Sequence, residues 1–184
     1  MTFEQLSIPE VLLITPTRHG DARGWLTEAY SQRAMAEAGV HDVFVQDNHA
    51  YSPARGTLRG LHLQVPPHAM SKLVRAARGA IFDVAVDVRA GSPTYGRWAG
   101  AELSADNGRM LYVPRGFAHG YLTLTPDAEV LYKLDGLYAP ECERGLLWND
   151  PAVGIAWPLG ADQIILNARD QDFPGLADFT PVEL

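Results

Sequence analysis

The sequence predicts a mainly β protein that folds as a jelly-roll barrel or sandwich. Short apolar stretches recur along most of the 184 residues, and Gly, Pro, Asn and Asp separate them. This spacing is typical of short antiparallel strands joined by turns. One segment, residues 31–39, predicts a helix instead, because Ser31 can cap its first turn and Gly39 can end it.

Turn signals divide the expected strands. We expect strands within five stretches, at 41–52, 57–64, 72–93, 97–116 and 118–138. Each of the last three predicts two strands, because a turn signal interrupts it. These signals are Gly79, the hairpin-like Asp106-Asn107-Gly108, and Thr125-Pro126-Asp127. The chain after Tyr138 is richer in Pro, Trp and Asp, and we expect it to be irregular.

Alternation predicts which side chains share a face of a strand. In the stretch "RGLHLQ", Gly60, His62 and Gln64 should share one face, and Leu61 and Leu63 the other. Further along, Phe82, Val84, Val86 and Val88 should lie opposite Asp83 and Asp87. A single histidine on a strand is more often structural than chemical, so His62 alone indicates no function.

Composition limits the classes of protein. With 47% hydrophobic and 20% charged residues, the chain is typical of a soluble globular protein, and we expect one domain over residues 1–184. A net charge of −7 argues against general nucleic-acid binding. The single cysteine, Cys142, excludes an internal disulfide. The N-terminus shows no signal peptide or membrane span, so we expect a cytoplasmic protein and no membrane partner.

Two stretches, 56–79 and 108–119, resemble the two motifs of the cupin barrels. A metal-binding cupin usually supplies His-x-His, a Glu and a later His, whereas here Gln64 stands in place of the second His and Lys72 in place of the Glu. A protonated ammonium group offers a cation no lone pair. Only two histidines then remain as ligands, and we expect no bound metal.

A different chemistry fits the polar residues on these strands. A barrel interior normally holds Leu, Ile and Val, so several polar groups there indicate either a buried network or a ligand pocket. A His base, a Lys cation and a Tyr acid are the groups needed for proton abstraction next to a carbonyl. Arginines can bind phosphate, and an aromatic ring can stack on a base. The residues concerned are Gln46, Asn48, Arg59, His62, Lys72, Asp83, His119 and Tyr132.

The chain resembles the dTDP-4-dehydrorhamnose 3,5-epimerase family over about residues 8–172. The resemblance implies a cupin-fold homodimer that needs no cofactor or metal. It also implies a dTDP-sugar substrate, with epimerisation at C3 and C5 of dTDP-4-dehydro-6-deoxy-D-glucose in the synthesis of dTDP-L-rhamnose or a related deoxysugar. It rests on several stretches taken together: "DARGWLTEAY", "VQDNHAYS", "TLRGLHLQ", "SKLVRAARGAIFDVAVDVRAGSPTYGRW", "LYVPRGFAHGY", "EVLYK", "YAPECERGLLWND" and "ILNARD".

The resemblance assigns a role to each matching residue. His62 matches the general base, Tyr132 the general acid, Asp170 the carboxylate that hydrogen-bonds the base, and Lys72 the group near the C4 carbonyl oxygen. Some of the binding residues are expected to act across the dimer. The residues that match substrate contacts are Arg23, Glu28, Gln46, Asn48, Arg59, His119, Tyr138, Glu143 and Arg169.

Several alternatives stay open at this stage. Relatives that invert only C3 or only C5, in antibiotic deoxysugar synthesis, share almost all the same motifs, and a non-catalytic cupin that binds a nucleotide sugar would keep the arginines. Asp83 rather than Asp170 could orient His62. Gly136 is expected to loosen the loop that leads to Tyr138. The apolar segment 9–14 would form an open sheet edge, which predicts pairing with a partner chain.

Overall fold

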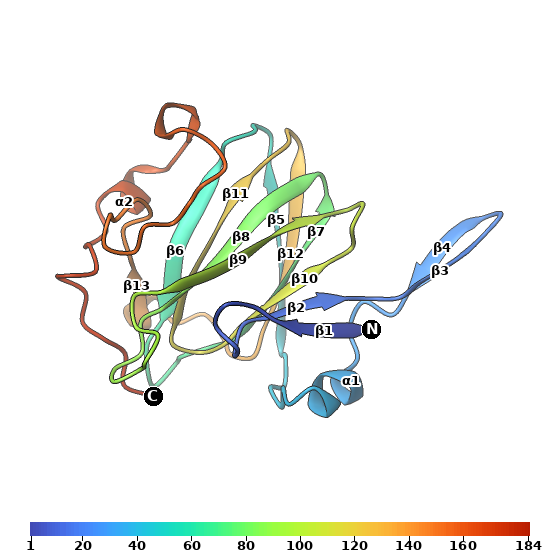
Figure 1. Ribbon diagram of the computed structural model, residues 1–184, viewed down its shortest axis with the longest axis horizontal. Coiled ribbons are helices and arrows are strands. Elements are labelled where there is room, and N and C mark those ends of the chain that lie inside the picture. The colour runs from blue at the N-terminus through green and yellow to red at the C-terminus, as the bar shows by residue number, and fades with distance from the viewer.

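Two facing antiparallel sheets form the body of the protein, and a two-stranded hairpin stands away from it (Figure 1). The computed structural model describes residues 1–184. One sheet has the order β1 (Thr2–Gln5), β2 (Leu12–Thr15), β10 (Met110–Val113), β7 (Lys72–Arg78), β12 (Ala128–Leu134), β5 (Gln46–Ser52). The other has the order β13 (Glu143–Gly145), β6 (Leu58–Gln64), β11 (Phe117–Thr123), β8 (Ala80–Asp87), β9 (Trp98–Ser104). The hairpin consists of β3 (Arg18–Asp21) and β4 (Gly24–Thr27). The predicted mainly β class is confirmed.

Helices are few and short. The predicted early helix is present as α1 (Gln32–Glu37), with the Ser31 hydroxyl accepting the Ala34 N–H at 3.4 Å and Gly39 at φ +88° after its end. After Tyr138 the chain is largely irregular, as expected. Its regular elements are β13, α2 (Ala168–Gln171) and the 3₁₀ turns Pro140–Cys142 and Ala161–Gln163. None of the helices has the length and apolar character needed to span a bilayer.

From β5 onward, consecutive strands lie in opposite sheets, except that β8 and β9 are neighbours in the five-stranded sheet. The hairpin expected around Asp106-Asn107-Gly108 is wrong in this respect: β9 pairs with β8, whereas β10 pairs with β2 and β7. The turn itself forms, because the Asn107 side chain accepts the N–H groups of Ser104 and Arg109 and Gly108 adopts φ +64°. A turn signal therefore specifies the local reversal of the chain and not the strand partner.

The core lies between the two sheets, and the outer face of the five-stranded sheet is also covered. Val74, Leu111 and Val130 of one sheet pack with Ile81 and Leu103 of the other. The alternation predicted for β8 is confirmed. Phe82, Val84, Val86 and Val88 pack on the outer face under the C-terminal tail, whereas Asp83 and Ala85 point to the interior.

The apolar segment 9–14 does not form an open edge. Val11, Leu12, Leu13 and Ile14 are buried, and β2 pairs with β1 on one side and β10 on the other. The open edges of this sheet are β1 and β5. The edge argument for a partner chain is therefore wrong, because the segment finds both of its neighbours within the same chain.

A bulge in β6 changes which of its residues face inward. His62 pairs with His119, and Arg59 pairs with Tyr121. Between these two pairs β6 contains one residue more than β11, which is a β-bulge. Gly60 adopts φ +132°, and a Cβ built there would lie 2.6 Å from the Gly120 Cα and 2.8 Å from the His119 carbonyl oxygen. Strict alternation would separate Arg59 from His62, but the bulge lets both line one cavity.

Gly60→Ala should destabilise the fold strongly, because the added Cβ meets backbone atoms that cannot move aside. We expect a loss of about 3 kcal/mol or more in the free energy of unfolding, measured with urea. Gly91→Ala is the matched control: Gly91 also has positive φ, at +68°, but a Cβ there meets nothing within 4 Å. The control should lose only about 1 kcal/mol. Equal losses for the two variants would contradict the close approach of β6 and β11.

Candidate active site

A cavity of about 260 Å³ opens between the two sheets, and we call it the inner cavity. The residues that line it come from β5, β6, β7, β11, β12, β13 and the segment around α2. Most of its lining is polar, which contrasts with the apolar core beside it. Its lining residues are Ala50, Arg59, His62, Lys72, His119, Tyr121, Tyr132, Glu143, Asn167, Arg169 and Asp170.

His62 is held by a buried carboxylate. Its Nε2 lies 2.8 Å from Asp170 Oδ1, and the other Asp170 oxygen accepts the Gly60 N–H at 3.0 Å. Burial raises the pKa of Asp170, but hydrogen bonds from His62 and from the Gly60 N–H outweigh it and keep this pKa below its ordinary value. Asp170 is therefore ionised at neutral pH. Asp83, the alternative partner left open by the sequence, does not orient His62, since it binds His119 instead.

This contact fixes the tautomer of the neutral imidazole. Because Nε2–H donates to Asp170, Nδ1 carries the lone pair and has no partner within the protein. Nε2 then cannot accept from the Arg169 guanidinium, so their 3.3 Å approach is a contact between two donors. The guanidinium instead donates to Glu143 Oε2 at 2.9 Å. His62 is thus oriented as a base with its free nitrogen unblocked.

A second histidine–carboxylate pair lies beside the first. His119 faces His62 across β6 and β11, and its Nε2 lies 2.8 Å from Asp83 Oδ1. Burial lowers the pKa of His119 more than the Asp83 charge raises it. The ring is consequently neutral, with Nε2–H donating to Asp83, which leaves Nδ1 to accept from Lys72 Nζ at 3.4 Å.

Lys72 is the buried cation of the inner cavity. Burial lowers its pKa to about 8, against the opposing charges of Asp83 and Glu143. Its Nζ also donates to the His62 carbonyl oxygen at 3.2 Å. With one proton directed to that carbonyl and one to His119, the third N–H is available to a ligand. A carbonyl or enolate oxygen is the kind of group it would bind.

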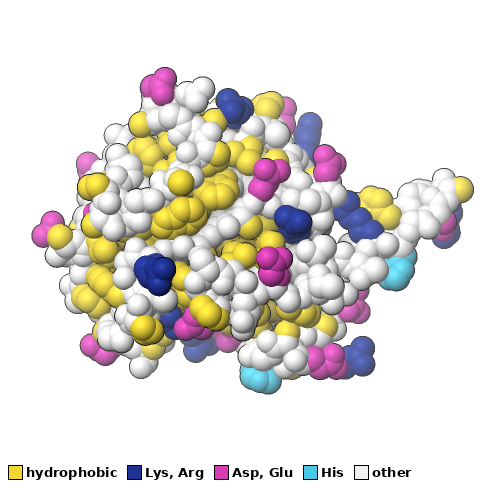
Figure 2. Space-filling model, viewed as in Figure 1, with side chains coloured by type: hydrophobic (Ala, Val, Ile, Leu, Met, Phe, Trp, Pro, Cys, Tyr) yellow, Lys and Arg dark blue, Asp and Glu magenta, His cyan; other side chains and the backbone are white.

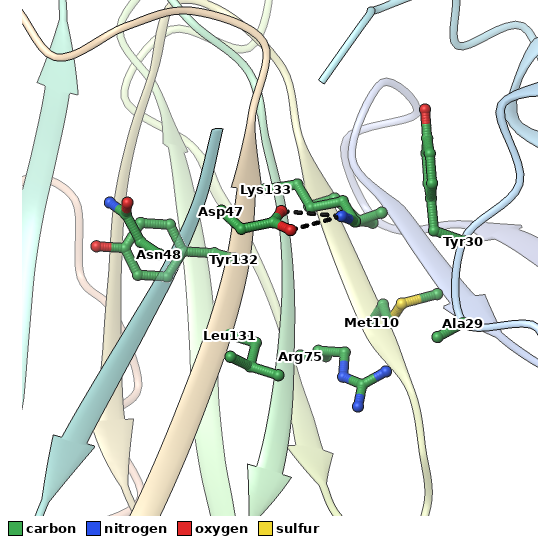
Figure 3. Close-up of a pocket in the computed structure, with 10 residues that line it drawn as sticks. Ala29, Tyr30, Asp47, Asn48, Arg75, Met110, Leu131, Tyr132 and Lys133 are labelled. Atoms are coloured by element: carbon green, nitrogen blue, oxygen red, sulfur yellow. Dashed lines mark hydrogen bonds and ion pairs between the residues drawn. The ribbon is translucent and has the colours of Figure 1, made fainter. Parts of the chain in front are cut away.

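Tyr132 approaches from the opposite wall. It lies on β12 of the six-stranded sheet, whereas His62 lies on β6 of the five-stranded sheet, and both line the inner cavity. Figure 3 shows that Tyr132 and Asn48 extend to the opposite side of the sheet from the ion pair between Lys133 and Asp47. That ion pair borders a surface hollow of about 280 Å³ on the outer face of the sheet. The outer hollow is more apolar and holds none of the histidines.

A smaller cavity of about 130 Å³ adjoins the inner cavity, and we call it the adjoining cavity. The two share His62, Lys72, Tyr132 and Glu143. Tyr138, which is 59% exposed, lies at the adjoining cavity and donates to Glu143 Oε2 at 3.0 Å. Asn48 lines it too, and the Gln46 amide donates to the Asn48 side-chain oxygen at 2.9 Å.

The structure brings together most of the residues singled out from the sequence, but three of them line neither cavity. Gln46 reaches the site only through Asn48. Arg23 lies on the hairpin with its side chain 90% exposed and pairs with Asp21, and Glu28 is exposed just after β4. Neither Arg23 nor Glu28 lines a cavity of this chain that contains His62.

Three lining or supporting residues were not foreseen in their places. Asp83 was predicted to lie opposite the apolar face of its strand, but only the pairing of β8 with β11 directs it to His119. Tyr121 lines the inner cavity with a buried hydroxyl that has no partner. Asn167 caps α2 by accepting the Asp170 N–H at 2.7 Å. Asn is one of the residues preferred at a helix N-cap, so Asn167 itself is the signal that the sequence of this segment contains.

Metal ligation does not fit the inner cavity. One nitrogen of each histidine is bound to a carboxylate, and His119 uses its other nitrogen for Lys72. The ammonium group of Lys72 repels a cation at the centre of the set. The metal-ligand types that do cluster, His68, Glu141 and Cys142, lie within 4.8 Å of one another but line neither the inner nor the adjoining cavity.

The arrangement supports proton transfer at carbon. A base with a free nitrogen lies on one wall and a phenol lies on the other. An ammonium group with a free N–H lines the same cavity and can stabilise negative charge that develops on an oxygen. A substrate with an acidic C–H next to a carbonyl fits this set. Arg59 and Arg169 add positive charge suited to an anionic group.

Comparison with known proteins agrees with this chemistry. Residues 5–178 match the family described as dTDP-4-dehydrorhamnose 3,5-epimerase. A protein of that name from Pseudomonas aeruginosa is 51% identical over 97% of each chain. The Legionella pneumophila 3,5-epimerase, solved in complex with dTDP-4-keto-L-rhamnose, superposes with a TM-score of 0.92 at 40% identity, covering 97% of this chain and 94% of that one.

A more distant structure has a narrower activity. A 3′-monoepimerase from Streptomyces bikiniensis, in complex with dTDP-quinovose, gives a TM-score of 0.86 at 39% identity and covers 94% of this chain and 86% of that one. The expected cupin-like β fold is thus shared with epimerases of dTDP-sugars. On the extent of the family match and the identity to its characterised members, the chain belongs to the dTDP-4-dehydrorhamnose 3,5-epimerase family of carbohydrate epimerases.

Proposed function

We propose that this protein inverts both C3 and C5 of dTDP-4-dehydro-6-deoxy-D-glucose, in the synthesis of dTDP-L-rhamnose or a related deoxysugar. The C4 ketone makes the hydrogens on both neighbouring carbons acidic, so one set of groups can act at each carbon in turn. The single observation that carries the proposal is the placement of His62 and Tyr132 on strands of opposite sheets that line one cavity, which Lys72 also lines.

The first half of each inversion is deprotonation. His62 Nδ1 removes the carbon-bound proton, and the Asp170 carboxylate stabilises the imidazolium that forms. The electron pair moves onto the C4 oxygen, where the free N–H of Lys72 stabilises the enolate. Because Lys72 is anchored to the His62 carbonyl and to His119, it needs no reorganisation when the charge appears.

The second half is reprotonation from the other face. Inversion requires that the new proton arrive on the side opposite to the base. Tyr132 lies on that side and can donate its phenolic proton to the carbon, after which proton exchange with solvent restores both residues. A non-catalytic nucleotide-sugar binder has no need for an acid and a base facing each other, so the geometry favours the enzyme.

Deuterium incorporation tests the reaction. In heavy water we expect label at both C3 and C5 by NMR. His62→Ala should abolish exchange and lower turnover by about 100-fold or more. Tyr132→Phe should impair inversion while exchange at the His62 face continues. Tyr51→Phe is the control, because that hydroxyl bonds Asp127 on the turn before β12 and should change neither rate.

Two results would contradict the mechanism. A Tyr132→Phe enzyme that inverts both carbons at the wild-type rate would remove Tyr132 from it. Label at only one carbon in the wild type would favour the mono-epimerase activity that the Streptomyces bikiniensis structure represents.

The charge of Lys72 should set the alkaline limit of activity. Its pKa of about 8 means that the ammonium group loses its proton within the working range of the assay. We expect kcat/KM to fall as the pH rises through about 8, because the neutral amine stabilises the enolate poorly. Lys72→Arg keeps its charge at high pH, so the fall in kcat/KM should shift to a higher pH. Thermal unfolding checks that the variant folds. A profile that stays flat well above pH 8 would contradict the role.

Arg23 and Glu28 contribute to the site only if a second copy of the chain is present. The hairpin extends away from the body (Figures 1 and 2), and its Trp25 and Leu26 are 58% and 76% exposed. Apolar side chains on a hairpin that extends from the body need a surface to cover them. We call this β3–β4 hairpin the arm. We therefore propose a homodimer in which the arm of one protomer reaches the inner cavity of the other and brings Arg23 to the substrate phosphates. The proposal also places the protein in the cytoplasm, where nucleotide sugars are made.

Subunit complementation tests this assembly. Light scattering at micromolar concentration should give twice the chain mass, and a monomer would contradict the proposal. Arg23→Ala and His62→Ala should each be weakly active, but mixing them after partial unfolding and refolding should restore activity, because each mixed dimer holds one intact site. The control is the double variant Arg23→Ala/His62→Ala alone, unfolded and refolded in the same way. Its activity should stay low. Absence of recovery in the mixed sample would place Arg23 in its own chain's site.

A further inference from the structure

Gln64 uses every hydrogen-bonding group of its buried amide to join two loops. Its Nε2 donates to the His68 carbonyl oxygen at 2.8 Å and to the Leu137 carbonyl oxygen at 3.3 Å. Its Oε1 accepts the Ala139 N–H at 2.8 Å. The side chain is only 5% exposed, so these bonds are shielded from water. The amide thus fastens the loop after β6 to the loop after β12.

Two of these bonds flank one residue. Leu137 and Ala139 are the chain neighbours of Tyr138, so Gln64 fixes the backbone on both sides of it. The Tyr138 ring itself is exposed and makes one hydrogen bond, to Glu143. Its place at the adjoining cavity therefore depends on its backbone, since the side chain is not packed into the core. A small rotation of this loop would move the ring away from the cavity.

Neighbouring contacts hold the start of the same loop. Asp135 accepts the Ser71 N–H at 2.7 Å and two N–H groups of Arg115, at 3.0 and 2.6 Å. Gly136 lies against Met70, where a Cβ would make an ordinary contact at 3.4 Å. Hydrogen bonds to Asp135 therefore hold the chain just before Gly136, and the expectation that this glycine loosens the loop stays a prediction. The remaining stretch, from 137 to 139, has Gln64 as its side-chain anchor.

We propose that Gln64 is a positioning residue that sets Tyr138 for binding the nucleotide of the substrate. The proposal deepens the proposed function and rests on its assignment of Tyr138 to the nucleotide base. The position is the second residue of a His-x-Gln pair, where a metal-binding cupin has a ligand. Here the same position serves the neighbouring loop: His62 faces the reacting carbons, while Gln64 two residues later holds the binding loop.

The test separates binding from chemistry with Gln64→Glu. The carboxylate keeps the acceptor for Ala139 but loses both donors and faces two carbonyl oxygens. We expect dTDP to bind about tenfold more weakly, equivalent to about 1.4 kcal/mol, while kcat at saturating substrate stays within about twofold. Lowering the pH should narrow the gap to wild type, because a protonated Glu regains one donor. Ser92→Ala, in a turn packed on Asp87, is the remote control and should leave dTDP binding unchanged.

A double-mutant cycle identifies the route of the effect. If Gln64 acts through Tyr138, Gln64→Glu should weaken dTDP binding no further in a Tyr138→Ala background. Additive losses, or a fall in kcat without a change in dTDP affinity, would overturn the proposal. Thermal unfolding checks that the variants fold.

Amide hydrogen exchange keeps the test independent of the proposed function. Gln64→Met removes the oxygen that accepts the Ala139 N–H, so we expect faster exchange at that N–H. Unchanged protection there would contradict the role of Gln64 in holding the loop. A wild-type protein that binds dTDP but exchanges no carbon-bound hydrogen would refute the epimerase mechanism. The amide exchange at Ala139 would still test whether Gln64 holds the loop. A Tyr138→Ala variant that binds dTDP like the wild type would refute the assignment of Tyr138 to the nucleotide. It would thereby also refute the proposed role of Gln64 in nucleotide binding.

Discussion

The close approach of β6 and β11 at Gly60 and Gly120 is the constraint on which the site depends. Side chains at these positions would collide with the facing backbone, and the space they leave allows the bulge in β6. The bulge turns the Gly60 N–H toward Asp170 and places His62 opposite His119. Without it, the strand would direct Arg59 and His62 to different faces. One backbone irregularity therefore orients the base, its carboxylate and an anion-binding arginine together.

The contacts among the buried charged groups explain how a polar cavity can lie beside the apolar core without destabilising it. Asp83 and Asp170 are both fully buried, and each is bound to a histidine on the adjacent strands. Lys72 connects the two histidines, through a backbone carbonyl in one case and a ring nitrogen in the other. An isolated buried carboxylate or ammonium group would cost several kcal/mol, so each group is tolerated because the others are present. Removing one member therefore disturbs the charge state of the rest as well as its own contact.

Sequence reasoning predicted the faces of the strands better than their partners. Alternation put Asp83 on the face opposite to Phe82 and Val84, because a period of two needs only the local pattern. It did not show that Asp83 binds His119, since the pairing of β8 with β11 joins segments far apart in the chain. For the same reason the turn at Asp106 suggested a hairpin, whereas its two strands lie in different sheets. The motif resemblance supplied Asp170, which no local pattern connects to His62. The bulge at Gly60 was not predicted, because one glycine in a strand does not distinguish a bulge from a regular pair.

The C-terminal segment links stability to the site. Leu146, Val153, Phe179 and Val182 cover the outer face of the five-stranded sheet. The chain that makes these contacts also carries Glu143, Arg169 and Asp170 to the inner cavity. At β13, Gly145 leaves room for the Phe173 ring, which packs edge-on against His62 with 5.6 Å between ring centroids.

The irregular structure of this segment follows from the two tasks. A regular strand would present alternate residues to two faces, but this segment must cover an apolar surface along much of its length and turn inward at a few points. Asn167 marks one such point, where a single capped turn directs Asp170 through the edge of the sheet to His62. Apolar contacts hold this segment on the sheet, and hydrogen bonds from His62 and the Gly60 N–H hold the carboxylate itself. Loosening those contacts should weaken the orientation of the base before it unfolds the barrel.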